Sequence, residues 1–146
     1  MSVGRFLQQA AAGADESFDA VDVFSADLYE GNNVSSTVNN GINLSGKGGL
    51  VWIKQRETGS TNHVWTDTVR GAGKGLYANT TAVEFTQPWA VNSFSSSGYV
   101  NTGSDGYNNG YEKDYVGWTF RKAPGFFDVV TWIEDGSTTA ISHDLD

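Results

Sequence analysis

The sequence Asp114-Tyr-Val-Gly-Trp-Thr-Phe-Arg121, followed by Lys-Ala-Pro-Gly125 and an apolar run over 126–134, decides the fold class. In its first part Tyr, Gly and Thr alternate with Val, Trp and Phe, and this period of two is typical of a β-strand with one buried face. Pro124 lacks a backbone N–H and therefore belongs to the connection. We predict two paired strands, 114–121 and 126–134, at the centre of an all-β domain.

The rest of the chain repeats this pattern of short strands and tight turns. Its 146 residues include 18 glycines, two prolines and no cysteine, which indicates one domain with many turns and no disulfide framework. Turn signals such as Asn40-Gly41 and Asp135-Gly136 favour hairpins. We therefore predict an antiparallel β-sandwich of jelly-roll type. Its strands are expected at 23–29, 35–38, 50–56, 64–68, 75–78, 93–94, 99–102, 114–121, 126–134 and 138–142.

The net charge of −8 is distributed unevenly along the chain. A block of acids without a compensating base lies within residues 15–30, whereas residues 31–133 are close to neutral. No basic stripe is present, so nucleic-acid binding is not expected, and no apolar run approaches the roughly 20 residues of a membrane span. We interpret the acidic block as a solvated linker. Its members are Asp15, Glu16, Asp19, Asp22, Asp27 and Glu30.

Residues 2–12 differ from the rest of the chain because their apolar residues recur with helical spacing. Val3, Phe6, Leu7, Ala10 and Ala11 fall at i, i+3, i+4, i+7 and i+8, and a glycine follows the run. An isolated helix of this length is marginal in water, so it must dock on its own domain, a second copy or another protein. We divide the chain into an attachment region, 1–22, and a β-sandwich domain, 23–146.

Acidic residues provide little support for an enzyme. Glu112 and Asp114 could form part of a glycosidase site, but the position of a third acid on that strand is occupied by Gly117. Asp67 and Asp128 interrupt apolar strands and are candidates for buried structural carboxylates. We predict a non-enzymatic protein without a cofactor.

A loop rich in Asp and Asn is a weak candidate for a calcium site. Asp105, Asn108, Asn109 and Asp114 supply the hard oxygen ligands that Ca²⁺ prefers. Their spacing is not that of an EF-hand, and residues of these types also build ordinary turns.

Aromatic residues in the predicted loops suggest glycan binding. Trp89, Tyr107 and Tyr111 lie near Asn and Asp side chains, an arrangement that could stack on a sugar and hydrogen-bond its hydroxyls. The alternative is that Trp89 packs over one end of the sandwich. Exposure of these rings would favour sugar binding, whereas burial would favour a structural role.

Several strings of the sequence resemble a family of virion proteins from bacteriophages of marine bacteria and cyanobacteria. The resemblance covers nearly the whole chain. It is carried by the N-terminal string Met1 to Gly13, by Asp22-Val-Phe-Ser25, Gly49-Leu-Val-Trp-Ile-Lys54 and Asp67-Thr-Val-Arg-Gly71, and most specifically by Trp118 to Val130.

This resemblance implies a concanavalin- or laminin-G-like β domain and a structural role in the virion, in a tail fibre or appendage. It also implies that residues 2–12 attach the domain to other virion proteins or join its copies in a homo-oligomer, with a trimer favoured. Longer members of that family continue with further similar domains. The alternatives are a capsid decoration protein and a lectin-like module that contacts glycans on the host surface. The resemblance implies no catalytic residue.

Overall fold

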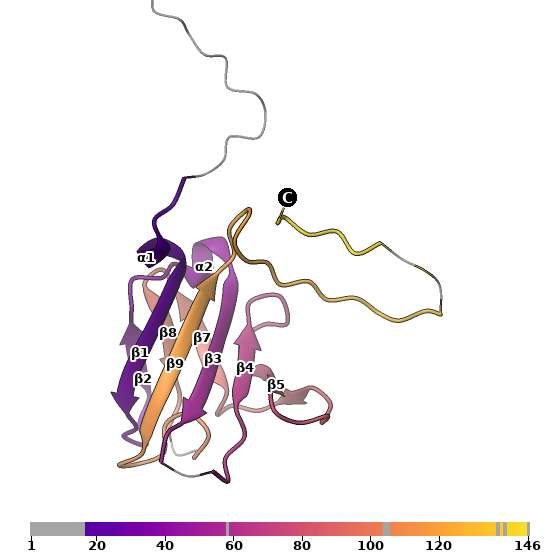
Figure 1. The fold of residues 1–146 in the computed structure, drawn as a ribbon. Coiled ribbons are helices and arrows are strands. Elements are labelled where there is room, and N and C mark those ends of the chain that lie inside the picture. The colour runs from indigo at the N-terminus through magenta and orange to yellow at the C-terminus, as the bar shows by residue number, and fades with distance from the viewer. Residues whose placement is uncertain (1–16, 58, 104–105, 137, 139, 146) are drawn as a thin grey trace, which may run out of the picture.

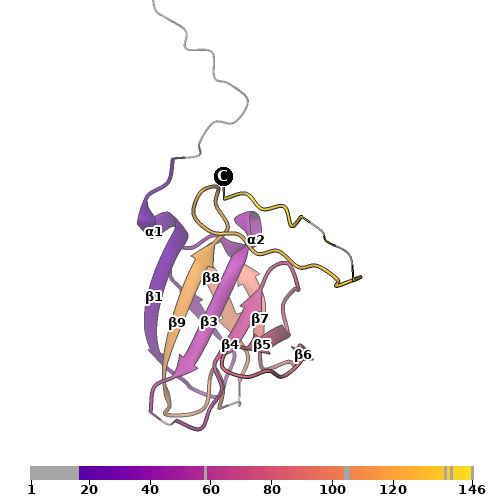
Figure 2. The ribbon, with the colours of Figure 1, turned by 45° about the vertical axis from the view of Figure 1, so that its right-hand side comes forward.

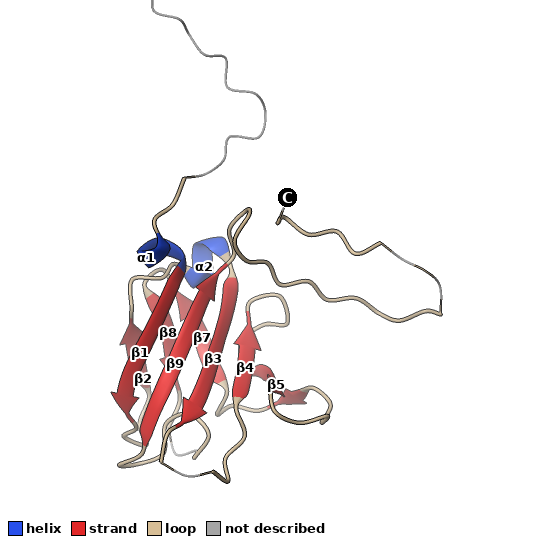
Figure 3. Ribbon diagram, viewed as in Figure 1, coloured by secondary structure: helices blue, strands red, loops and turns tan. Residues whose placement is uncertain are grey.

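The computed structural model describes residues 17–57, 59–103, 106–136, 138 and 140–145. Within these residues the fold is all-β, with two antiparallel sheets and two short helices (Figures 1 and 3). The β-sandwich architecture predicted from the sequence is confirmed at this level, and the jelly-roll topology stays a prediction. Residues 2–12, for which we predict a helix, lie outside the described residues.

The larger sheet has six strands in the order β1-β9-β3-β4-β5-β6, and the smaller sheet has the order β2-β8-β7. Figure 2 shows the smaller sheet behind the larger one. The six strands are β1 (Phe24–Glu30), β9 (Asp114–Arg121), β3 (Gly49–Gln55), β4 (Val64–Asp67), β5 (Lys74–Tyr77) and β6 (Phe85–Thr86). The remaining elements are β2 (Ser36–Asn39), β8 (Gly98–Asn101), β7 (Val91–Ser95), α1 (Ala20–Val23) and α2 (Leu44–Lys47).

The core lies between the two sheets and is built by the alternation that the sequence displays. Along β3, Val51 and Ile53 are fully buried, and Tyr115 of β9 projects into the same layer. Tyr99 of β8 meets them from the smaller sheet. The buried cluster consists of Ile42, Leu44, Val51, Ile53, Val91, Tyr99 and Tyr115.

One glycine of β9 makes this packing possible. Gly117 lies opposite the ring of Tyr99, and a Cβ atom at this position would stand 2.2 Å from the Tyr99 hydroxyl oxygen. No side chain fits at that distance, so Gly117 lets the tyrosine of the smaller sheet approach the backbone of the larger one.

The prediction of a strand at 126–134 is wrong. Only an isolated bridge joins Ala123 to Phe127, and no strand is assigned between 128 and 134. The reason is topological: β9 is already paired with β1 on one side and with β3 on the other, so a hairpin partner has no free edge of β9 to join. The described part of 138–142 forms no strand either.

The other predicted strands are present, with boundaries shifted by up to two residues, and β9 has the predicted boundaries. Strand β6, which has two residues, was not predicted. No helix in the described part of the chain is long and apolar enough to cross a membrane.

The interpretation of the whole acidic block as a solvated linker is also wrong. Asp27 lies within β1, where its carboxylate accepts hydrogen bonds from Ser25 (2.9 Å) and from the side-chain amide of Asn40 (2.9 Å). Asp22 lies in α1 and accepts from the backbone N–H of Asp19 at 3.1 Å. These acids therefore shape the first turn and first strand of the domain.

Candidate functional site

The face of the six-stranded sheet that points away from the core carries a second apolar layer. Leu50 and Trp52 alternate with the buried residues of β3 and are only half-buried. Neighbouring strands add side chains of the same kind on this face, as the strand register requires. We call this set the outer apolar layer: Leu50, Trp52, Trp65, Leu76, Trp118 and Phe120.

The tryptophans of the outer apolar layer pack against each other at steep angles. The ring centroids of Trp52 and Trp118 lie 4.9 Å apart with an interplanar angle of 48°, and those of Trp52 and Trp65 lie 5.8 Å apart at 84°. Tilted and edge-on pairs are the arrangement that aromatic side chains adopt in cores and interfaces. The layer is therefore not a flat platform for stacking sugar rings, and it suits contact with another polypeptide.

A cavity of about 960 Å³ lies between the outer apolar layer and the segment that follows β9. Trp52, Trp65 and Phe120 line it from the sheet, whereas Val129 and Trp132 line it from the segment. Trp132 is 64 % exposed, and the side chains of the outer apolar layer are themselves only half-buried, so the segment covers the layer incompletely. Charged residues complete the lining: Asp67, Arg70, Lys74, Glu84 and Asp128.

Asp67 has a structural role at the end of β4. Its side chain is fully buried, and it accepts hydrogen bonds from the backbone N–H groups of Val69 (3.0 Å) and Arg70 (2.8 Å). It also pairs with the Arg70 guanidinium through two nitrogens, with Nε at 2.5 Å. Because both carboxylate oxygens already have partners, Asp67 fixes the turn at 67–71 and is not available to a ligand.

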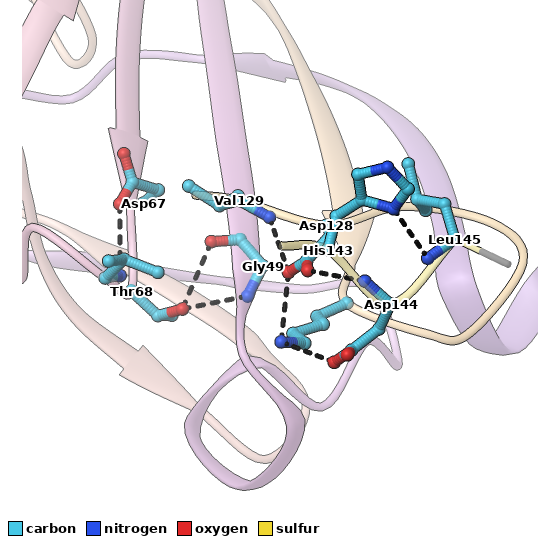
Figure 4. Close-up of polar contacts among 10 residues, drawn as sticks. Gly49, Asp67, Thr68, Asp128, Val129, His143, Asp144 and Leu145 are labelled. Carbon is cyan, nitrogen blue, oxygen red and sulfur yellow. Dashed lines mark hydrogen bonds and ion pairs between the residues drawn. The ribbon is translucent and has the colours of Figure 1, made fainter. Parts of the chain in front are cut away.

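Asp128 joins distant parts of the segment after β9 to one another. Its buried carboxylate accepts from Lys122 Nζ at 3.0 Å, from Asp144 N–H at 3.1 Å and from Val129 N–H at 2.8 Å (Figure 4). Burial alone would raise the pKa of Asp128, but these hydrogen bonds outweigh it and lower that pKa. Lys122 Nζ also pairs with the Asp144 carboxylate at 2.9 Å, and its hydrogen bonds to Asp144 and Asp128 raise the pKa of Lys122.

The two histidines are placed differently. The His63 ring lies 6.2 Å from Trp52, beside the outer apolar layer, and burial together with the charge of Lys54 lowers its pKa. His143 accepts from the backbone N–H of Leu145 at 3.3 Å (Figure 4). Among the described residues, no group of three or more His, Cys, Asp or Glu side chains is placed to hold a metal ion.

The structure brings together two of the three predicted glycan-binding residues. Trp89 and Tyr107 stack with centroids 4.9 Å apart and an interplanar angle of 21°. Together with two neighbours they form what we call the ring cluster: Tyr77, Phe85, Trp89 and Tyr107, all half-buried. Tyr111 lies outside this cluster and is 61 % exposed.

Two of the predicted calcium ligands form hydrogen bonds that join loops of the domain. Asn109 is fully buried, accepts from Asn32 N–H at 3.2 Å and donates to the Val34 carbonyl oxygen at 2.6 Å. Asn108 is also fully buried and donates to the carbonyl oxygen of Trp89. Asp114 is separate from them and forms an ion pair with Arg56 at 3.7 Å. Asp105 lies outside the described residues.

Sequence reasoning missed the outer apolar layer as a surface, although a signal for it is visible. Residues 50–53 read Leu-Val-Trp-Ile without a polar interruption, and a strand that is apolar on both faces is one that is covered on both faces. The polar alternation expected of a strand with one solvent-exposed face is therefore missing from β3.

Comparisons with known proteins add a family but no described activity. No curated protein and no solved structure matches the chain. Residues 19–146 match the model of one protein family, described as "Domain of unknown function (DUF7483)". The match begins one residue before α1 and includes every strand of both sheets. Because it covers most of the sequence, the chain belongs to the DUF7483 family.

Proposed function

We propose that the chain is a non-enzymatic structural protein of a bacteriophage particle, located in a tail fibre or appendage. The resemblance of the strings at 1–13 and 118–130 to phage virion proteins supports the setting. The observation that supports a structural role is the outer apolar layer. Because of this layer, the six-stranded sheet has an apolar face on the side away from the core as well as on the core side.

A large apolar face on a soluble domain marks a surface for a partner. Next to the outer apolar layer, β1 adds Leu28, which is 67 % exposed, and Phe24, which is 38 % exposed. The strand register places Phe24 opposite Phe120 and Leu28 opposite Val116, so these side chains continue the same face. A surface of this kind suits lasting assembly with protein neighbours in a particle.

In this proposal residues 2–12 attach the domain to the particle. The chain enters the described structure beside the end of β9: the Phe18 and Phe126 rings lie 6.0 Å apart, and the Arg121 guanidinium stands 5.8 Å from the Phe18 ring centroid. These contacts fix the place on the domain surface at which the chain passes from the attachment region into the domain. An apolar stripe at Val3, Phe6 and Leu7 is then available to a neighbouring virion protein.

The test is incorporation into particles. Phages carrying the double variant Phe6→Ser/Leu7→Ser should contain little of this chain, as measured by mass spectrometry of purified particles, while the isolated variant keeps its β-sheet circular dichroism. Gln8→Ser/Gln9→Ser changes the polar positions of the same stretch and should incorporate normally. Absence of the unmodified chain from particles would rule out the proposal. Labelling by electron microscopy separates a tail location from a capsid decoration protein.

A second candidate function is glycan binding at the ring cluster, favoured by the near-parallel stack of Trp89 on Tyr107. In this candidate the rings of the cluster pack against one another, and their exposed parts contact the apolar side of a sugar. Trp89→Ala should then abolish a glycan-array signal that Tyr111→Ala retains, because Tyr111 lies outside the cluster. An equal signal from both variants contradicts this assignment.

A further inference from the structure

Two regions of the molecule hold most of its exposed large apolar side chains. Of the twelve such residues in the described chain, four lie on or beside β1 and five lie between 126 and 145. The first group is Val21, Phe24, Leu28 and Val34, and the second is Phe126, Trp132, Ile133, Ile141 and Leu145. Each region therefore has apolar surface to bury.

The segment 127–133 has the composition of a strand, but its only backbone pairing among the described residues is the bridge from Phe127 to Ala123. Between 128 and 134, no backbone–backbone hydrogen bond joins it to another described residue. Its sequence is Phe-Asp-Val-Val-Thr-Trp-Ile, rich in β-branched and aromatic residues. Trp132 is 64 % exposed and Ile133 is 92 % exposed. Apart from the Val129 N–H, which donates to the Asp128 carboxylate, the backbone groups of 128–133 thus have no partner among the described residues, and apolar side chains are exposed beside them.

Strand β1 offers the complementary feature, an open edge. It pairs with β9 on one side only and is the last strand of its sheet on the other. Proteins usually protect such edges with charged residues, proline or a bulge. Strand β1 carries two charged residues, Asp27 and Glu30, but no Lys or Pro; it pairs with β9 in continuous register, and Leu28 is 67 % exposed.

We propose that residues 127–133 of one copy of this chain add as a strand to the β1 edge of a second copy. Segment and edge each have seven residues. An antiparallel arrangement brings Ile133 to the end of β1 that begins with Phe24 and keeps Glu134 away from Glu30. A parallel arrangement would instead place these two acids together, at a cost in stability. Backbone pairing would satisfy the free groups, and the alternate side chains Phe127, Val129 and Ile133 would continue the outer face beside Phe24 and Leu28.

The positions of the two surfaces determine the symmetry of the association. In Figures 1 and 2, β1 forms one edge of the larger sheet, and the segment after β9 extends beyond the opposite side. Donor and acceptor are therefore different surfaces, and such head-to-tail contacts give closed rings or filaments and not two-fold dimers. The proposed function supplies only the biological setting of this inference, which purified protein can test without particles.

The experiment uses the full chain and two variants, each of which removes one surface. Thr131→Pro blocks backbone pairing at a position whose N–H has no backbone acceptor among the described residues. Leu28→Lys places a charge on the β1 edge. By sedimentation velocity, we expect the unmodified chain to form an oligomer of three or more copies and each variant to be a monomer. An equimolar mixture of the variants should form a 1:1 dimer, because only one donor–acceptor pair remains.

Ser142→Pro is the matched control, since it puts proline into an exposed position of the same region outside 127–133 and should leave the oligomer intact. A monomeric unmodified chain overturns the proposal, as does an oligomer that neither Thr131→Pro nor Leu28→Lys disturbs. A mixture of the variants that stays monomeric overturns the head-to-tail arrangement. None of these results depends on whether the chain occurs in a phage particle, so the failure of this inference and of the proposed function can be distinguished.

Discussion

The two faces of the six-stranded sheet are both apolar but differ in what covers them. On the inner face, Val51, Ile53 and Tyr115 are fully buried by the smaller sheet. On the outer face, Trp52 and Trp118 are only half-buried, and the segment after β9 spans part of the layer. The inner face therefore stabilises the domain, whereas the outer face is the one that the proposed function assigns to assembly.

The largest expected effect concerns Asp67, the buried charged residue on the outer face of the sheet. Asp67→Ala would leave the Arg70 guanidinium and two backbone N–H groups without their acceptor. Removing one partner of a buried pair is strongly destabilising, so we expect the free energy of unfolding to fall by about 4 kcal/mol. Urea unfolding followed by tryptophan fluorescence measures it.

The control for Asp67→Ala is Arg56→Ala, which removes an exposed ion pair with Asp114 at 3.7 Å. Exposed pairs contribute little, so this variant should change the stability by less than about 0.5 kcal/mol. If the two variants were equally stable, Asp67 would have no structural role, and the outer face would contain no fixed polar element.

The second prediction compares the two faces along one strand. Ile53→Ala, on the inner face, creates a cavity in the closed core and should cost about 3 kcal/mol. Leu50→Ala, on the outer face of the same β3, removes a half-buried side chain and should cost about 1 kcal/mol. Equal losses in urea unfolding would show that the outer layer is as much a core as the inner one.

The third prediction concerns a hydroxyl that joins the core to a loop. Tyr115 donates from its hydroxyl to the Gly106 carbonyl oxygen at 2.8 Å and accepts from Gly110 N–H at 2.9 Å. Tyr115→Phe keeps the ring but leaves both loop groups unpaired, so we expect a loss of about 2 kcal/mol. Tyr111→Phe, at an exposed ring, is the control and should be neutral in thermal unfolding.

These comparisons also explain which parts of the structure could be predicted from the sequence. Strand β9 was predicted with its boundaries because alternation is a local property, and the pattern of Tyr115, Gly117 and Thr119 identifies one face without reference to the rest of the chain. The prediction of a strand at 126–134 was wrong because strand pairing depends on which strand edges are free in the folded sheet. That information lies in the positions of β1 and β3 on either side of β9.

The candidate site was harder to predict for a related reason. Trp89 and Tyr107 were identified as aromatic loop residues, but their stacking joins positions far apart in the chain and depends on the folded loops. Asn108 and Asn109 have the residue type of calcium ligands, whereas their buried amide groups form hydrogen bonds to Trp89 and to residues 32–34. Residue type therefore indicated where polar chemistry is concentrated, but not what its partners are.

The smallest expected effect is the pH dependence of the contact that holds the segment after β9. Lys122 lies between Asp128 at 3.0 Å and Asp144 at 2.9 Å. The pKa of Asp128 is lowered, so its contribution to stability is present above the ordinary carboxyl value of about 3.9 and is lost as the pH falls through the lower folded value. The pKa of Lys122 is raised, so its contribution is present below about 10.4 and is lost as the pH rises through the higher folded value.

Asp128→Asn removes the negative charge next to Lys122 and keeps the shape of the side chain. The difference in the free energy of unfolding between this variant and the unmodified chain therefore measures the contribution of that charge. Because Lys122 is 39 % exposed and screened by solvent, we expect a difference of about 1 kcal/mol or less. It should be constant from about pH 5 to pH 9 and shrink below about pH 4 and above about pH 10.5. A difference that does not vary with pH would show that hydrogen bonding alone holds the segment. In that case the position of the segment over the outer face would be independent of the charges around Lys122.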